Sequence, residues 1–214
     1  MKRELDYIFL DLDGPILEGK NRHFQCYSEI LKDFGGTPLN SERYWNLKRA
    51  RVPRDQVLEA SKFGASYETF ANEWMERIES EKFLSFDVLK PKIRETLSEW
   101  RELFNNVSIE LVTMRQSRPN LEAQLKRLNV IDCFDVITDC PPMRANTKYQ
   151  ALKGRKFNRA IFIGDTEEDV NTAKLLGIPS IGVLNGIRDK EYLLADYFAN
   201  EIVDINFSHL DYIT

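Results

Sequence analysis

The chain has 214 residues, of which 43% are hydrophobic and 30% are charged, with 10 Gly and 8 Pro. This composition excludes disordered, collagen-like and fibrous proteins, and the length suffices for one large domain or for one domain with an insertion. The formal net charge of −4 argues against a nucleic-acid-binding protein, because binding to the phosphate backbone requires a basic surface.

The cysteine and histidine content bears on metal sites and on the compartment. Three cysteines without a CxxC pair, and two histidines, make a zinc site of the Cys/His type improbable, and we expect reduced thiols. The apolar run near the N-terminus is too short for the core of a signal peptide, and no later run is long enough to span a membrane. We therefore expect a soluble, cytoplasmic protein.

The first predicted element is a strand over residues 7–10, and a helical segment follows it. The apolar side chains of residues 20–90 recur at helical spacing rather than in strand-like runs. This spacing is carried by Phe24, Tyr27, Leu31 and Phe34, and again by residues 67–78. The pattern predicts a mostly helical insertion over residues 18–90.

Predicted helices and strands alternate from residue 91 onward. Four short apolar runs predict strands buried on both faces, at residues 109–112, 136–137, 160–163 and 181–184. Helices are predicted between them, one beginning near Pro119 and one ending at Gly177. The alternation predicts an α/β domain, a Rossmann-like doubly wound parallel sheet, built from residues 1–17 and 91–214.

Polar residues follow the predicted strands, where ligands bind in open α/β sheets. Asp11 and Asp13, in DLDGP, follow the first strand, and Thr113 ends the second. Asp165 and Asp169, in GDTEED, follow the fourth. Several carboxylates at one point are costly without a cation, since buried like charges must otherwise take up protons. Carboxylate and carbonyl oxygens suit Mg²⁺, so the pattern predicts a magnesium site.

This combination of groups supports phosphoryl transfer. One carboxylate can attack a phosphate held by Mg²⁺, giving an aspartyl phosphate, while a second protonates the leaving oxygen. A hydroxyl, backbone N–H groups and a lysine would neutralise the phosphoryl oxygens. Purely structural interpretations exist as well, because Asp is common before Gly in turns and Asp169 could serve only the dipole of its helix.

The ordered set resembles the haloacid dehalogenase superfamily, in its phosphatase branch, over nearly the full length. DLDGP looks like the first motif, Thr113 like the second and GDTEED like the fourth. The resemblance implies that Asp11 is the nucleophile and Asp13 the general acid/base. It also implies that Asp11, Asp165 and the backbone carbonyl of Asp13 bind Mg²⁺, with Asp169 supporting the metal site through water.

The second and third motifs of that family bind the phosphoryl group. By the resemblance Thr113 does so here, and Met114 beside it is a further candidate for substrate binding. The third motif should be a lysine shortly before the fourth strand. Lys148, which opens a helical stretch, is the preferred candidate, with Arg144 and Lys153 as alternatives.

The helical insertion is similar to the C1-type cap of the same superfamily, which closes over the site and excludes water. His23 falls where β-phosphoglucomutase and phosphoglycolate phosphatase relatives often carry a His-Phe pair, and Arg54 takes the place of a substrate-contacting arginine. Both are substrate-binding candidates, although a partly buried hinge histidine is the commoner explanation of His23, and basic runs like the one that contains Arg54 most often form a solvated helix face. Gly19 and Lys20 depart from the usual residues, which leaves the substrate open.

The sequence thus predicts a Mg²⁺-dependent phosphatase of a small phosphorylated metabolite, monomeric by default, without a nucleic-acid or membrane partner. A β-phosphoglucomutase-like mutase would use the same residues and differ in closure and water exclusion. A receiver-type signalling domain also combines acids, Mg²⁺, Thr and Lys, but such domains are far shorter. A dehalogenase is disfavoured because Asp13 has no task in displacing a halide.

Overall fold

The computed structural model describes residues 4–104, 106–142 and 144–209. The chain divides into two compact units. The core unit comprises Met1–Leu17 and Leu89–Thr214, and the helical unit comprises Glu18–Val88. The chain passes between them through β2 (Leu17–Glu18) and β3 (Val88–Leu89), which pair as a two-stranded sheet.

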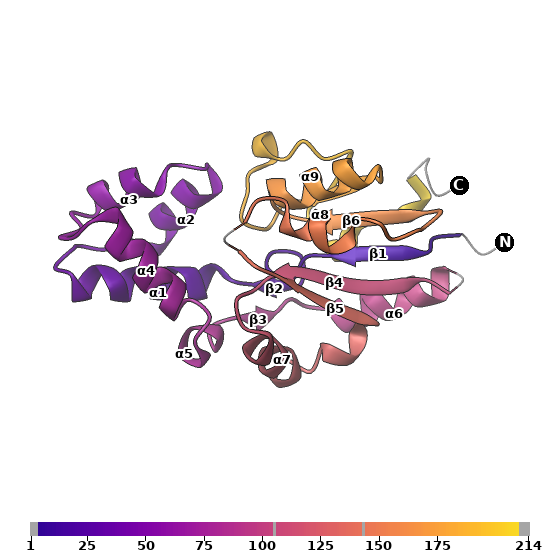
Figure 1. Ribbon diagram of the computed structural model, residues 1–214, viewed down its shortest axis with the longest axis horizontal. Coiled ribbons are helices and arrows are strands. Elements are labelled where there is room, and N and C mark those ends of the chain that lie inside the picture. The colour runs from indigo at the N-terminus through magenta and orange to yellow at the C-terminus, as the bar shows by residue number, and fades with distance from the viewer. Residues whose placement is uncertain (1–3, 105, 143, 210–214) are drawn as a thin grey trace. The chain divides into compact units, whose positions relative to one another are not determined.

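A six-stranded sheet forms the centre of the core unit, with the strand order β5-β4-β1-β6-β7-β8 and all pairings parallel (Figure 1). The strands are β1 (Tyr7–Leu10), β4 (Ser108–Met114), β5 (Val136–Cys140), β6 (Ala160–Gly164), β7 (Ser180–Val183) and β8 (Tyr197–Ala199). β1 lies in the middle, where Leu10 pairs with Leu111 on one side and with Ile163 on the other. This parallel α/β sheet confirms the predicted fold class.

Helices cover both faces of this sheet (Figure 1). They are α6 (Ile93–Leu103) and α7 (Arg118–Arg127) on one face, and α8 (Thr147–Leu152) and α9 (Glu167–Leu176) on the other. Alternate residues of β1 point to opposite faces: Ile8 and Leu10 share a core with α6 and α7, whereas Phe9 packs with Leu152 and Ala173. Burial on both faces is the reason that the strands are continuous apolar runs.

The ends of the helices are set by local sequence. Ser117 caps α7, accepting a hydrogen bond from the backbone of Asn120. Thr166 and Asp169 form a capping box at the start of α9, and Gly177 ends that helix with a positive φ of 69°. Short 3₁₀ turns complete the core unit at Ile131–Cys133, Lys190–Tyr192, Ile202–Asp204 and Phe207–His209.

The helical unit contains α1 (Lys20–Asp33), α2 (Ser41–Arg49), α3 (Arg54–Ala60), α4 (Tyr67–Arg77) and α5 (Glu81–Leu84). Its core is rich in aromatic side chains, including Tyr27, Phe70 and Trp74. The sequence predicted α1 and α4, whereas the shorter α2, α3 and α5 were not predicted. In the part of the chain that the structure describes, no helix is both long and apolar enough to cross a membrane.

A buried ion pair joins the two ends of the helical unit. Arg22 Nε, on α1, lies 3.2 Å from Asp87 Oδ2, just before β3, and the two side chains are 2% and 0% exposed. Breaking such a pair leaves a buried charge without compensation. We expect Arg22→Met to lower the free energy of unfolding by about 3–5 kcal/mol, measured by urea denaturation with tryptophan fluorescence.

The exposed Arg43, on α2, supplies the matched control, and Arg43→Met should change stability by less than about 0.5 kcal/mol. The double variant Arg22→Met/Asp87→Leu should recover most of the loss, because it removes both charges. A single-variant loss below about 1 kcal/mol would contradict this account of the pair.

Candidate active site

The carboxyl ends of β1, β4 and β6 meet at one edge of the sheet, and candidate site residues lie there. Asp11 directly follows β1, Thr113 is the penultimate residue of β4 and Asp165 directly follows β6. All three are buried. The backbone N–H of Asp11 donates to the carbonyl of Ile163 over 2.9 Å, which continues the β1–β6 pairing as far as the site.

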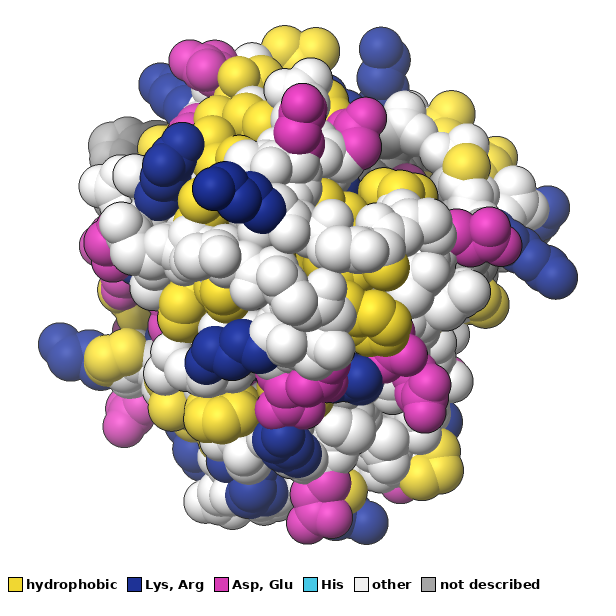
Figure 2. Space-filling model, turned by 90° about the vertical axis from the view of Figure 1, so that its left-hand side faces the viewer, with side chains coloured by type: hydrophobic (Ala, Val, Ile, Leu, Met, Phe, Trp, Pro, Cys, Tyr) yellow, Lys and Arg dark blue, Asp and Glu magenta, His cyan; other side chains and the backbone are white. Residues whose placement is uncertain are grey.

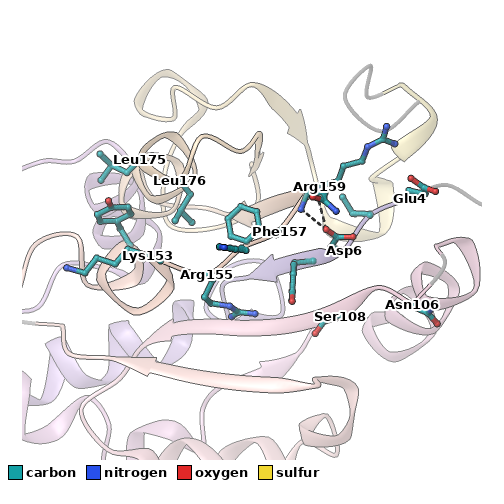
Figure 3. Close-up of a pocket in the computed structure, with 16 residues that line it drawn as sticks. Glu4, Asp6, Asn106, Ser108, Lys153, Arg155, Phe157, Arg159, Leu175 and Leu176 are labelled. Atoms are coloured by element: carbon teal, nitrogen blue, oxygen red, sulfur yellow. Dashed lines mark hydrogen bonds between the residues drawn. The ribbon is translucent and has the colours of Figure 1, made fainter.

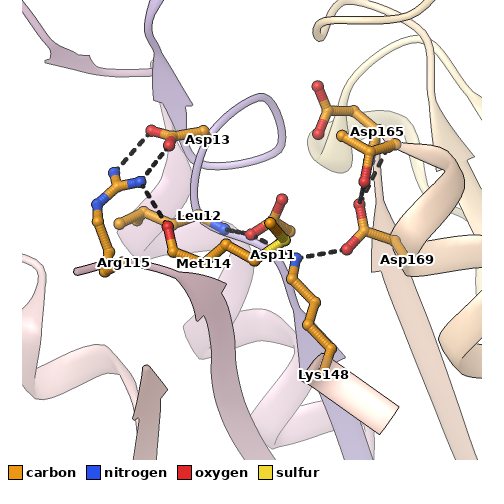
Figure 4. Close-up of polar contacts among 9 residues, drawn as sticks. Asp11, Leu12, Asp13, Met114, Arg115, Lys148, Asp165 and Asp169 are labelled. Atoms are coloured by element: carbon orange, nitrogen blue, oxygen red, sulfur yellow. Dashed lines mark hydrogen bonds and ion pairs between the residues drawn. The ribbon is translucent and has the colours of Figure 1, made fainter. Parts of the chain in front are cut away.

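Lys148, in the first turn of α8, reaches into this group of acids. Its Nζ lies 2.9 Å from Asp11 Oδ1 and 2.5 Å from Asp169 Oδ1 (Figure 4). The lysine is 1% exposed. Of the three candidates for the third motif, the structure brings Lys148 to Asp11, whereas Arg144 and Lys153 are exposed.

Three carboxylates come together at a single point. Oxygens of Asp11, Asp165 and Asp169 lie within 4.8 Å of one another, and all three residues are buried. Burial raises the pKa of Asp11 to about 6, although Lys148 opposes the rise. Burial, followed by repulsion from Asp11, raises the pKa of Asp165 well above its ordinary value. Ionising Asp11 and Asp165 at the same time is therefore unfavourable.

Lys148 remains the charged partner within this group. Burial lowers the pKa of its ammonium group, but the charges of Asp11 and Asp169 outweigh burial, so that the net shift is upward. A lysine held between two carboxylates thus remains a cation at neutral pH.

The acids fit a hard divalent cation. Asp165 Oδ1 is buried and has no hydrogen-bond partner within the described residues, while Oδ2 accepts from the backbone of Ile187 over 2.5 Å. A buried carboxylate oxygen without a donor is costly, and a cation would relieve that cost. Carboxylate oxygens are the ligands that Mg²⁺ prefers.

Glycines leave the space that these carboxylates occupy. A Cβ at Gly14 would lie 2.2 Å from Asp165 Cγ, and one at Gly186 would lie 2.0 Å from Asp165 Oδ2. Gly14 also has a positive φ of 96°, which favours glycine on backbone grounds alone. Gly186 and Ile187 lie in the loop after β7, where sequence analysis had placed no site residue; the Asn-Gly pair at 185–186 was the available signal.

Asp169 contacts both the start of its own helix and the buried lysine. Its Oδ2 accepts from the backbone N–H of Thr166 over 3.0 Å and from the Thr166 hydroxyl over 2.6 Å, which caps α9. Its Oδ1 accepts from Lys148. One side chain therefore fixes the start of a helix and the position of the buried lysine.

Asp13 points away from the other acids. Its two carboxylate oxygens accept from Arg115, with Nη2 at 2.9 Å from Oδ1 and Nη1 at 2.5 Å from Oδ2 (Figure 4). Arg115 follows β4 directly and is 5% exposed. Sequence analysis missed this residue; a basic side chain two positions after Thr113, at a strand end, was the available signal. Met114, between them, offers its carbonyl to Arg115 Nη1 at 3.2 Å.

The remaining candidates, His23 and Arg54, belong to the helical unit and lie around one indole. The Arg54 guanidinium carbon is 5.0 Å from the centroid of the Trp74 ring, and the His23 ring is 5.5 Å from it. Lys48 Nζ is 5.4 Å from the same centroid. The helical unit therefore gathers basic side chains on an aromatic surface, an arrangement that stabilises cations.

A separate cleft of about 990 Å³ lies at the amino ends of the strands (Figure 3). Two of its charged side chains bind the protein itself: Arg155 donates to both oxygens of Glu110 at 2.6 and 2.7 Å, and Asp6 accepts from the backbone of Asn158 and Arg159. Among the described residues that line it, none has a buried side-chain donor or acceptor without a partner. We assign no ligand to this cleft.

Comparisons with known proteins point to one family. The family model described as haloacid dehalogenase-like hydrolase matches residues 7–183. This match confirms the resemblance seen in the sequence motifs. The comparison with curated protein sequences gave no match.

Several solved structures have a similar fold. A predicted phosphatase from Clostridium acetobutylicum is 18% identical, with a TM-score of 0.71 over 91% of this chain and 93% of that one. A predicted phosphoglycolate phosphatase from Haemophilus somnus is 16% identical, with a TM-score of 0.70 over 94% and 96%. A protein assigned as a β-phosphoglucomutase from Thermotoga maritima is 20% identical, with a TM-score of 0.65 over 93% and 95%. At these identities the likeness concerns the fold alone.

Proposed function

The chain belongs to the haloacid dehalogenase-like hydrolase family, and on this premise we propose that it is a Mg²⁺-dependent phosphatase acting through an aspartyl-phosphate intermediate. Its substrate would be a phosphate monoester of a small metabolite. The supporting observation is the buried group of Asp11, Lys148, Asp165 and Asp169 at the carboxyl ends of the strands. This group combines a nucleophile, a cation and the ligands of a metal ion in one place.

Asp11 is held in a defined orientation for attack. The backbone N–H of Leu12 donates to Asp11 Oδ1 over 2.8 Å, and Lys148 Nζ contacts the same oxygen. We assign the attack on phosphorus to Oδ2. The bond from Asp11 to phosphorus forms as the ester P–O bond breaks, and Asp13 gives its proton to the leaving oxygen. Water then attacks phosphorus, Asp13 takes up a proton from that water, and Asp11 is released.

Other residues of the core unit neutralise the phosphoryl group. We assign this role to Thr113 and Lys148, with Met114 beside Thr113 in the chain as a further substrate-binding residue. Mg²⁺, held by Asp11, Asp165 and the backbone carbonyl of Asp13, with Asp169 acting through water, would supply positive charge to the same oxygens. The acids then need not take up protons to lie together.

We assign the helical unit the role of a cap that excludes water, with His23 and Arg54 on the substrate side. Their gathering around Trp74, together with Lys48, favours an anionic substrate. Lysine, arginine and acidic side chains are interspersed on the face drawn in Figure 2, which agrees with a small-molecule partner rather than a nucleic acid. We propose that the protein acts as a cytoplasmic monomer.

A β-phosphoglucomutase-like mutase is the second candidate. The protein assigned that activity has the same fold, and a mutase would use the same residues while returning the phosphoryl group to a sugar. Family membership removes the receiver-type alternative.

A phosphate-release screen over phosphorylated metabolites tests the proposal. The panel should include glycolate and hexose phosphates, with detection of sugar-phosphate isomers. We expect phosphate release that requires Mg²⁺ and stops with a chelator. Isomer formation without release would establish the mutase instead, and release that is indifferent to chelator would contradict the metal's role.

The pH dependence of Mg²⁺ binding follows from the raised pKa of Asp11, about 6 against an ordinary 3.8. The folded metal-free protein holds this proton more tightly than the unfolded chain, so its stability falls as pH rises through about 6. Mg²⁺ competes with the proton, and its stabilisation should grow as the proton leaves. We expect the Tm increase caused by Mg²⁺ to be larger at about pH 7.5 than at about pH 5, in thermal melts.

Asp165→Asn provides the comparison for this effect, since removing one ligand should reduce the Tm increase at the higher pH. A Tm increase that is equal at both pH values, or larger at the lower one, would contradict the assignment of the metal to these carboxylates.

A further inference from the structure

Arg115 stands out because it is a buried arginine directed at the group assigned as the general acid/base. Its guanidinium makes two parallel contacts with Asp13, and only 4% of the Arg115 side chain is exposed, against 28% for Asp13. A bidentate arginine–carboxylate pair fixes the plane of the carboxylate as well as its position.

Arg115 is anchored at the end of a strand. Its backbone N–H donates to the carbonyl of Cys140, at the end of β5, over 2.9 Å. Its Nη1 also donates to the carbonyl of Met114 over 3.2 Å. Asp13, by contrast, lies in the loop after β1, next to Gly14 with its positive φ. The strand end therefore holds Arg115, and Arg115 holds Asp13.

Electrostatic repulsion acts between Asp13 and the buried Asp11. The charge of Asp13 contributes to the raised pKa of Asp11, so the two carboxylates lie close enough to repel each other. Lys148 contacts Asp11 and Asp169, whereas Arg115 contacts Asp13. The positive charge of Arg115 offsets this repulsion at the more exposed Asp13 side chain.

We propose that Arg115 is a positioning residue that orients the carboxylate of Asp13 for proton transfer to the leaving group. The inference rests on the proposed function and adds a residue to it. Arg115 itself makes and breaks no covalent bond. Asp13 takes up a proton from solvent on one oxygen, which gives up its contact with Arg115, and that proton then moves to the leaving oxygen while the other oxygen stays bound to Arg115.

A double-mutant cycle tests whether Arg115 acts through Asp13. With an alkyl phosphate that the wild type hydrolyses, we expect Arg115→Met to lower kcat by about 10- to 100-fold, with KM within about threefold. In the Asp13→Asn background, the same substitution should change kcat by less than about twofold, because the group it orients is already lost.

Two further variants separate positioning from a structural role. Arg115→Lys keeps the charge but not the bidentate geometry, and we expect an intermediate loss of kcat that also disappears in the Asp13→Asn background. It keeps the test decisive if Arg115→Met does not fold, as judged by circular dichroism. Arg118, three residues on and paired with Glu122 and Asp139, is the matched control, and Arg118→Met should leave kcat within about twofold.

The possible outcomes are distinct. Multiplicative losses in the double variant, a rise in KM with unchanged kcat, or a rise in kcat would each overturn the positioning role while leaving the phosphatase intact. A wild-type protein that releases no phosphate from any monoester overturns the proposed function, and the inference with it.

Discussion

Asp11→Asn should abolish phosphate release, with a loss of kcat of at least about 10⁴-fold. An amide oxygen cannot form the aspartyl phosphate. The groups that contact Asp11 Oδ1 are the N–H of Leu12 and the ammonium of Lys148, and these donors cannot replace it as the nucleophile. The measurement is phosphate release from an aryl phosphate, followed to low levels with concentrated enzyme.

The same substitution should leave the metal-free protein at least as stable as the wild type at neutral pH. Burial raises the pKa of Asp11 to about 6, so its ionised form is unfavourable in the folded state, and a neutral amide of the same shape removes that charge. Activity should therefore fall while stability does not, and this result would exclude unfolding as the cause of the lost activity.

Asp139, near the end of β5, is the matched control for Asp11. It lies at the same edge of the sheet, but it pairs with Arg118 rather than with the buried acids. Asp139→Asn should keep kcat within about twofold. Full activity of Asp11→Asn would remove the nucleophile from the proposed mechanism.

Lys148→Met should combine a large loss of activity with a large loss of stability. Removing a preorganised cation from a buried phosphoryl site lowers kcat by about 10²- to 10³-fold. The substitution also leaves Asp11 and Asp169 without their buried cation, which costs about 3–5 kcal/mol of unfolding free energy in the metal-free protein at about pH 8.

This loss of stability should depend on pH in a defined direction. Lys148 opposes the rise in the pKa of Asp11, so this pKa should rise further without it. Asp11 of the variant should therefore take up its proton at a pH above about 6. The destabilisation should therefore shrink between about pH 8 and about pH 5, measured by urea denaturation. Lys153→Met, an exposed lysine just beyond α8, should show neither effect. A loss of stability that is independent of pH would contradict the ion-pair explanation.

Most of the sheet could be predicted from hydrophobic runs, because strands buried on both faces leave a clear signal. All five predicted strands are present, and β1 matches residue for residue. The sixth, β8, is a three-residue edge strand with exposed or half-exposed side chains, so it lacks that signal. The short α2, α3 and α5 were missed for a similar reason, since each buries only one or two side chains.

The residues of the candidate site divide in the same way. Asp11, Asp13 and Asp165 could be predicted because each follows a predicted strand, and strand ends of a parallel sheet converge. The sequence favoured Lys148 over Arg144 and Lys153 but left all three open, because all three precede β6. Only the packing of α8 decides which one is buried.

By itself, the sequence determined the α/β sheet, the helical insertion and the acids at the strand ends, because these depend on periodicity and on order along the chain. Only the tertiary structure decided which cation meets which acid. Lys148 reaches Asp11 from α8, and Arg115 reaches Asp13 from the end of β4, 102 positions further along the chain. Such pairings depend on distances in space and on burial, and neither can be predicted from local sequence.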